Sequence, residues 1–187
     1  MKRALAFARR NARELVRDPL TVGFSLGFPL VLLALLTIIQ HNIPVSMFEI
    51  DRLAPGVAAF GLTFAALFSA TLIARDRASS LMLRLCASPM RPGDFIAGYL
   101  APMLPLCAAQ IAVCYAAALA AGLKLGGNAI LSMLTLLPAA ALYVAIGLLC
   151  GTLLNDRQVG GVCGALLTNV CAWLSGVWFD LSLLGDG

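Results

Sequence analysis

Five long apolar segments, free of internal charges, leave this chain few possible folds. A helix needs about 20 apolar residues to cross the hydrocarbon core of a bilayer. The segments that reach this length are Leu20–Ile39, Leu53–Ala74, Phe95–Gly122, Ala129–Leu154 and Val159–Phe179. Because lipid offers no hydrogen-bond partner to an open backbone, each continuous span must be helical. The sequence therefore predicts an all-α fold: a polytopic integral membrane helical bundle, with residues 20–187 as its transmembrane domain.

The composition excludes several classes of protein. Hydrophobic residues make up 61% of the 187 residues and charged residues 12%, whereas a soluble domain carries about 25% charged residues. The mean hydropathy is +0.94. These values exclude a soluble globular enzyme, a disordered chain and a small secreted disulfide scaffold. The six cysteines form no C-x-x-C pair and His41 is the only histidine, so we expect no metal site and no redox site.

The positive charges predict how the chain is oriented in a cell membrane. Residues 1–19, 75–94 and 155–158 would share one side of the bilayer and hold 11 of the 13 basic residues. The opposite side carries only Arg52 and Lys124. Since positive loops stay in the cytoplasm, the N-terminus is expected to be cytoplasmic, and five spans would place the C-terminus outside.

The first 19 residues are expected to form an amphipathic elbow helix. Wound at 100° per residue, the basic side chains fall in an arc about 120° wide: Lys2, Arg3, Arg9, Arg10, Arg13 and Arg17. The opposing arc holds Met1, Ala4, Leu5, Ala8, Ala12, Leu15 and Val16. Pro19 ends this helix and turns the chain into the first span. We expect the helix to lie on the cytoplasmic leaflet; the alternative is a polybasic segment that only sets topology.

The spans lack the residues that several membrane functions require. A proton-coupled secondary transporter needs an ionisable residue in the membrane and a voltage sensor needs an arginine ladder, and no span holds either. The chain has no H-E-x-x-H and no G-x-x-x-x-G-K-[ST] motif, and His41, its only histidine, is the one imidazole that could serve a nucleophilic serine. We therefore expect no catalytic residue, no metal ligand and no ATP hydrolysis by this chain itself.

Uncharged polar residues and paired glycines are the remaining candidates within the spans. The polar ones are Gln110, Tyr115, Tyr143, Thr168 and Asn169. Each would line a substrate pathway or bond to a neighbouring helix. Small residues recur four positions apart, as Gly147 with Gly151 and Gly160 with Gly164. This spacing predicts close helix packing.

The cytoplasmic loop over residues 75–94 is the most informative part of the sequence. Wound as a helix, one stripe holds Arg77, Ser80 and Arg84, and another face holds Ala78, Leu81, Met82, Leu85 and Cys86. Ser88-Pro89 would end this helix. A short two-faced helix of this kind suits docking of a cytoplasmic partner, the alternative being a solvated positive loop that only sets topology.

At three places the chain resembles the permease subunit of type-2 ATP-binding-cassette transporters, the drug- and polysaccharide-export class. Arg17-Asp18-Pro19 resembles the end of that family's elbow helix. Arg75-Asp76-Arg77, Met82–Leu85 and Ser88–Pro92 resemble the run after its second span, with Ala78, Ser80 and Leu83 as departures from the usual acid, glycine and glutamate. Leu174–Phe179 resembles the end of its fifth span.

The resemblance implies that residues 76–88 form a coupling helix seated in a groove of a separate cytoplasmic ATPase subunit. The contact residues expected from it are Arg77, Ser80, Leu81, Arg84 and Leu85. Two permease copies, or two related chains, would form the pathway. ATP and Mg would bind to the partner ATPase, with no cofactor on this chain. Because members typically have six spans, the resemblance also implies that this chain stops before the sixth.

The expected function is that of a permease subunit in an ATP-driven exporter, with a hydrophobic drug of the multidrug-resistance kind or a lipid-like compound as substrate and no nucleic-acid partner. This expectation depends largely on analogy to the family. The alternative is a membrane scaffold or anchor that recruits a cytoplasmic protein through the same loop without transport. A secondary transporter or channel agrees less well with the uncharged spans.

Overall fold

The computed structural model describes residues 2–43, 49–87, 91–124 and 126–175, and all regular structure in these ranges is helical. In chain order the elements are α1 (Lys2–Arg17), α2 (Pro19–Asn42), α3 (Ile50–Ala78), α4 (Ser80–Cys86), α5 (Pro92–Ala120), α6 (Gly127–Leu153), α7 (Asp156–Val159), the π-helical segment η2 (Gly160–Leu167) and α8 (Thr168–Leu174). The predicted all-α fold is confirmed.

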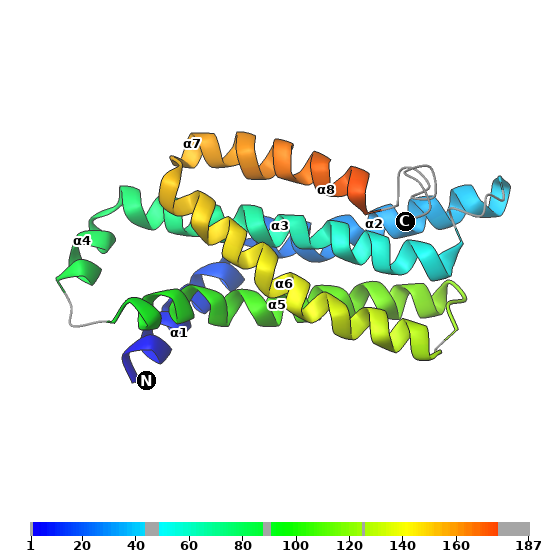
Figure 1. Ribbon diagram of the computed structural model, residues 1–187, viewed down its shortest axis with the longest axis horizontal. Coiled ribbons are helices and arrows are strands. Elements are labelled where there is room, and N and C mark those ends of the chain that lie inside the picture. The colour runs from blue at the N-terminus through cyan, green and yellow to red at the C-terminus, as the bar shows by residue number, and fades with distance from the viewer. Residues whose placement is uncertain (1, 44–48, 88–90, 125, 176–187) are drawn as a thin grey trace, which may run out of the picture.

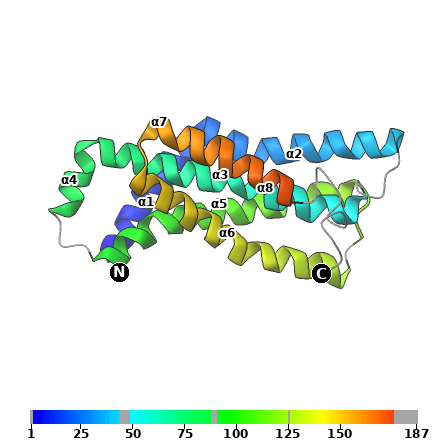
Figure 2. The same ribbon diagram turned by 45° about the horizontal axis from the view of Figure 1, so that its top comes forward.

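The long helices form a bundle around α3 (Figures 1 and 2). α3 contacts α2, α5 and α6, and the stretch from α7 to α8 packs along it as well. Most of its apolar side chains are buried, whereas α2 and α6 expose rows of leucine and isoleucine. Four helices, α2, α3, α5 and α6, are long and apolar enough to cross a membrane. An apolar exterior around a packed helix is the pattern of a bundle whose solvent is lipid.

The predicted fifth span differs from the other four. Sequence analysis expected one helix over Val159–Phe179, but residues 156–174 are divided into α7, η2 and α8, and residues 176–179 lie outside the described ranges. The structure therefore has four uninterrupted candidate spans instead of five in its described part. Gly160, Gly161 and Gly164 lie in η2, a type of winding that occurs mostly as short segments within α-helices. Hydropathy is insensitive to this change because it depends on the composition of the segment and not on its winding.

α3 and α6 approach closely because two glycines of α6 face α3. A Cβ atom on Gly147 would overlap the carbonyl oxygen of Ala66, and one on Gly151 would overlap that of Ala70. The Ser69 hydroxyl also lies 3.3 Å from the carbonyl oxygen of Val144 and donates to it across the interface. By contrast, a Cβ on Gly160 would meet no atom within 4 Å, and one on Gly164 would make only ordinary contact with Leu67.

The corner between α1 and α2 is formed by Asp18 and Pro19. The Asp18 carboxylate accepts hydrogen bonds from the amides of Leu20 (3.1 Å) and Thr21 (3.3 Å) and from the Thr21 hydroxyl (2.8 Å). These bonds cap the otherwise unpaired first amides of α2. The bond from the Thr21 hydroxyl, followed by those from the backbone, holds the pKa of Asp18 below its usual value.

Asp18→Ala is expected to lower the free energy of unfolding by about 1 kcal/mol. Because the pKa of Asp18 is lowered in the folded state, its contribution is present at neutral pH and is lost as the pH falls through that lowered pKa. Thermal unfolding in detergent at pH 7 and at pH 3 measures both effects. The control is Asp94→Ala, since Asp94 lies in the first turn of α5 but makes no side-chain hydrogen bond in the described structure. Equal losses for the two variants at pH 7 would contradict the capping role.

Candidate functional site at the basic end of the bundle

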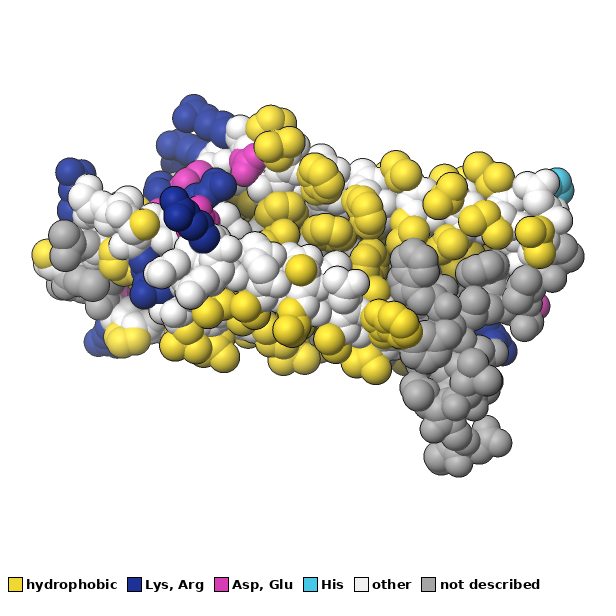
Figure 3. Space-filling view, turned by 90° about the horizontal axis from the view of Figure 1, so that it is seen from above, with side chains coloured by type: hydrophobic (Ala, Val, Ile, Leu, Met, Phe, Trp, Pro, Cys, Tyr) yellow, Lys and Arg dark blue, Asp and Glu magenta, His cyan; other side chains and the backbone are white. Residues whose placement is uncertain are grey.

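The elements that carry the basic segments meet at one end of the bundle. α1, α4, the end of α3 and the start of α5 lie together there (Figure 1). Figure 3 shows the lysine and arginine side chains gathered mainly at this end, with the histidine at the other. The charge asymmetry predicted from the loops is therefore also an asymmetry of the folded molecule.

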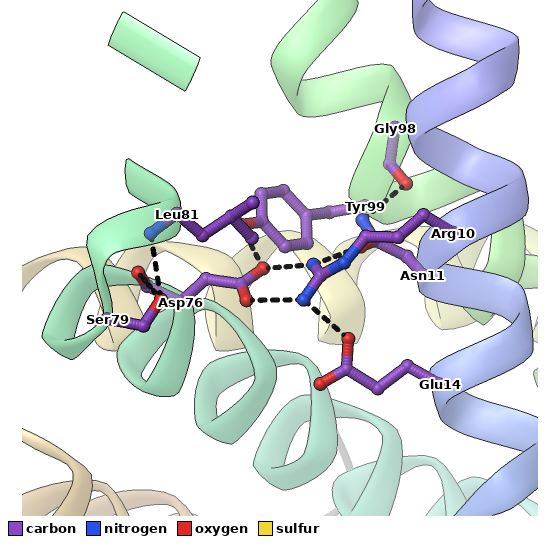
Figure 4. A network of polar contacts seen from close by, with 8 residues as sticks. All are labelled: Arg10, Asn11, Glu14, Asp76, Ser79, Leu81, Gly98 and Tyr99. Atoms are coloured by element: carbon purple, nitrogen blue, oxygen red, sulfur yellow. Dashed lines mark hydrogen bonds and ion pairs between the residues drawn. The ribbon is translucent and has the colours of Figure 1, made fainter. Parts of the chain in front are cut away.

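Asp76, one turn before α4, is the centre of a polar network between three helices (Figure 4). Its carboxylate is buried and accepts two hydrogen bonds from the Arg10 guanidinium of α1, at 2.8 and 3.0 Å. It also accepts one from the Tyr99 hydroxyl of α5, at 2.8 Å. Paired bonds between a guanidinium and a carboxylate are strong and fix relative orientation. Asp76 therefore joins the end of α3 to both α1 and α5.

Two further α1 side chains extend this network. The Glu14 carboxylate forms an ion pair with the Arg10 guanidinium at 2.8 Å. Asn11 is fully buried, accepts a hydrogen bond from Arg10 and donates one to the carbonyl oxygen of Gly98 on α5 at 3.0 Å. Burial lowers the pKa of Arg10, but the bond and the charge of Asp76 outweigh it and leave the pKa above its usual value. Arg10 thus stays cationic at any physiological pH.

An aromatic cluster seats α1 against α5 beside this network. The Phe7 ring stacks on Phe95 with centroids 5.8 Å apart and meets Tyr99 edge-on at 5.0 Å. A side chain on Gly98 would overlap the Phe7 ring. Glycine at position 98 therefore lets the two helices approach closely enough for the bond from Asn11.

The helical wheel of α1 predicted which face carries the basic residues, but it did not predict which residues are buried against the bundle. The residues packed against the bundle are Phe7, Ala8, Asn11 and Leu15. Leu5 and Val16, assigned to the same apolar arc, are 71% and 75% exposed. The predicted apolar arc is thus two surfaces, one against α5 and one facing outward. The wheel could not separate them because both are apolar. Asn11, polar and on the apolar side of the wheel, was the available signal of a buried contact.

The structure places Arg77, predicted as an ATPase contact, at the end of α6. Its guanidinium donates to the carbonyl oxygens of Gly151 at 2.9 Å and Leu154 at 3.4 Å. A cation at a helix C-terminus stabilises the last unpaired carbonyls. Nearby, Arg75 and Asp156 make a long, exposed ion pair of 3.9 Å. The end of α3 is therefore also joined to α6 and α7.

α4 is shorter than the coupling helix predicted over residues 76–88. It spans Ser80–Cys86, residues 76–78 belong to α3, and residue 88 lies outside the described ranges. The Ser79 hydroxyl bonds to the carbonyl of Asp76 and accepts from the amide of Leu81, which fixes the turn between the helices. Of the predicted contact residues, Ser80 and Arg84 are exposed, whereas Leu81 and Leu85 are half-buried. Leu85 packs against the main apolar core.

Three of the polar residues predicted within the spans bond between helices. Gln110 donates to the carbonyl of Ala58 (3.1 Å), Tyr115 is hydrogen-bonded to Ser132 (2.7 Å), and Tyr143 donates to the sulfur of Cys171 (3.3 Å). Asn169 of α8 is exposed and donates to the carbonyl oxygen of Ala165 in the preceding η2, and the Thr168 hydroxyl likewise donates to that of Cys163. Gln110, Tyr115 and Tyr143 therefore each join two separate helices of the bundle, whereas the bonds of Thr168 and Asn169 stay within the continuous stretch from η2 to α8. No cluster of metal-binding side chains occurs among the residues that the structure describes.

Comparison with known proteins agrees with this arrangement. Residues 3–186 match the family described as ABC-2 type transporter. The searches of curated proteins and of solved structures give no match. Members of the matched family lack ATPase domains, and four long apolar helices make this chain a multi-pass membrane protein. With almost its whole length matched, the chain belongs to the ABC-2 type transporter membrane family.

Proposed function

We propose that this chain is the membrane subunit of an ATP-driven exporter and that α4 docks on a separate cytoplasmic ATPase, which binds ATP and Mg. The observation that supports this most directly is the placement of α4. It lies at the basic end of the bundle with Ser80 and Arg84 outward, and the turn that carries it is joined through Asp76 to α1 and α5. The positive-inside rule places that end, with the N-terminus, in the cytoplasm.

The network explains how a force on α4 would reach the membrane helices. Only Ser79 separates α4 from α3, so α4 and the end of α3 move together. Asp76 passes that displacement to α1 and α5, and Arg77 passes it to α6. Four helices would therefore respond to one contact. Coupling of this kind needs two arrangements of a packed element, which the ATPase would favour in turn.

The pathway and its substrate follow from the family and from the uncharged spans. Two copies, or this chain with a related one, would enclose the pathway between them. Because the four candidate spans α2, α3, α5 and α6 carry no charged group in their central parts, a hydrophobic drug or a lipid-like compound suits such a pathway better than a strongly anionic polymer.

Arg84→Glu is expected to reduce recovery of the ATPase with the tagged chain by tenfold or more, because it reverses the one exposed charge of α4. The measurement is affinity purification from native membranes with quantification of the co-purified protein that carries the Walker phosphate loop. Arg157→Glu is the matched control, since Arg157 is also exposed at the basic end but lies in α7.

Equal recovery with Arg84→Glu and Arg157→Glu would contradict docking through α4. If the folded, unaltered chain recovers no Walker-loop protein but does recover another cytoplasmic protein through α4, the scaffold function replaces the exporter.

A further inference from the structure

A basic cavity of about 670 Å³ opens at the corner between α1 and α2. Its charged lining residues are Arg10, Arg13, Glu14, Arg17, Asp18 and Arg75. Pro19 and Leu20, where α2 enters its apolar stretch, complete the lining. The cavity therefore lies at the level where the polar end of the bundle meets its lipid-facing part. Neither the coupling contact nor the spans account for it.

The charges of this cavity are not balanced within the described structure. Glu14 is paired with Arg10, whose guanidinium is also bound to Asp76. The Asp18 oxygens are occupied by the first amides of α2 and the Thr21 hydroxyl.

Among the described residues, Arg13 and Arg17 have no hydrogen bond or ion pair from their side chains, and the pair from Arg75 to Asp156 is long and exposed. Three guanidinium groups thus line one cavity, and of these only Arg75 is partly compensated, by Asp156 and by the Asp18 carboxylate in the same lining. Such a set favours an anion that carries several acceptor oxygens.

A second, mostly apolar cavity of about 240 Å³ continues from the first. The two share Glu14, Asp18, Leu20 and Arg75 in their linings. The remaining lining of the second is largely apolar: Leu15, Thr21, Leu67, Phe68, Thr71, Leu72 and Met103. In Figure 3, hydrophobic side chains continue along the molecule directly from the charged end. A ligand that fills both cavities must have an anionic head and an apolar tail.

We propose that this corner binds one anionic phospholipid, with its phosphate on Arg13, Arg17 and Arg75 and an acyl chain in the apolar groove between α2 and α3. The position of the site supports a membrane lipid, because the groove begins where the lipid-facing part of α2 begins. A second copy of this chain is a poor occupant, since its own basic end would repel these arginines. The bound lipid would fix the elbow between α1 and the bundle. This proposal goes beyond the exporter function and does not require the ATPase.

The test is lipid binding by the purified chain in detergent, followed by native mass spectrometry. Dioleoyl phosphatidylglycerol is expected to bind at least tenfold more tightly than dioleoyl phosphatidylcholine, and glycerol 3-phosphate at least a hundredfold more weakly than phosphatidylglycerol. Removing two cationic contacts with Arg13→Gln/Arg17→Gln is expected to weaken phosphatidylglycerol binding about tenfold or more. Both side chains are exposed and unbonded, so the variant keeps its fold, which its thermal midpoint verifies.

Arg9→Gln/Arg157→Gln removes the same charge from exposed positions outside the cavity and is expected to change binding less than twofold. Equal losses for the two double variants would overturn the proposal in favour of general surface attraction. Equal binding of phosphatidylcholine would overturn the role of the arginines. Binding of glycerol 3-phosphate as tight as that of the lipid would reduce the site to a phosphate site and overturn the role of the groove.

Discussion

Asp76→Ala is expected to lower the free energy of unfolding by about 3 kcal/mol and to release α1 from the bundle. The substitution leaves the Tyr99 hydroxyl buried without its acceptor and Arg10 without its principal counterion. Breaking a buried ion pair costs about 3–5 kcal/mol. We place this case at the low end because the Arg10 side chain is 39% exposed and partly screened by solvent. If the proposed exporter function holds, the same variant is expected to uncouple ATP hydrolysis from transport while α4 keeps its own surface.

Thermal unfolding in detergent with a thiol-reactive dye measures the stability loss. Cys107, Cys114 and Cys163 are buried and react only when the bundle opens. Asp156→Ala is the matched control, because it removes an aspartate from an exposed, 3.9 Å ion pair worth about 0.5 kcal/mol or less. The double variant Arg10→Ala/Asp76→Ala is expected to lose less than the sum of the two single variants, since the groups act as one unit. Equal midpoints for Asp76→Ala and Asp156→Ala would show that the network contributes nothing to stability.

Gly147→Val is expected to cost about 3 kcal/mol or more, because α3 leaves no room for a side chain on this face of α6. The first added carbon already overlaps the Ala66 carbonyl and the Ser69 hydroxyl. Backbone atoms cannot rotate away, so relief requires the two helices to separate. Separation would in turn break the bond from Ser69 to the carbonyl of Val144. Loss of α3–α6 packing would affect the largest interface of the bundle.

Gly23→Ala is the control, because it also adds a side chain to a helical glycine but is not expected to lower the stability. Gly23 lies within α2, and a Cβ there would meet no atom within 4 Å. Because alanine favours helix over glycine by about 1 kcal/mol, this variant is expected to be neutral or stabilising. The dye assay measures both variants under the same conditions. A midpoint for Gly147→Val that equals or exceeds that of Gly23→Ala would contradict the close approach of α3 and α6.

Much of the fold could be predicted because each membrane span depends only on a local run of apolar residues, and such runs recur along the chain. Apolar runs of about 20 residues define spans by length alone, and four of the predicted spans coincide with α2, α3, α5 and α6. Arg17-Asp18-Pro19 marked the corner after α1, since aspartate caps a helix and proline suits its first turn. The fifth span was predicted as helical, but its division by η2 was not, because hydropathy is the same in either winding.

The candidate site was predicted only in outline. The loop pattern indicated a two-faced helix, and α4 places Ser80 and Arg84 outward and Leu81 and Leu85 partly inward. It did not show that Arg77 caps α6, because that bond joins residues 74 positions apart. Nor did it identify Asp76 as the buried centre, since an acid between two arginines at the end of a span is expected in water.

A bundle of apolar helices, with its basic residues gathered at one end, follows from the order of apolar and charged residues along the chain. The bilayer imposes the same requirements on every segment: an apolar run that crosses it must be helical, and positively charged loops stay in the cytoplasm. These requirements can be applied without knowing how the helices pack. Which charges pair inside the protein and which stay exposed depends instead on how the helices pack. Arg10 pairs with Asp76, and Arg77 donates to the carbonyl oxygen of Gly151 at the end of α6. Arg13, Arg17 and Arg84 are exposed. Burial and pairing of a charge depend on partners far away in sequence, and those partners exist only once the helices have packed.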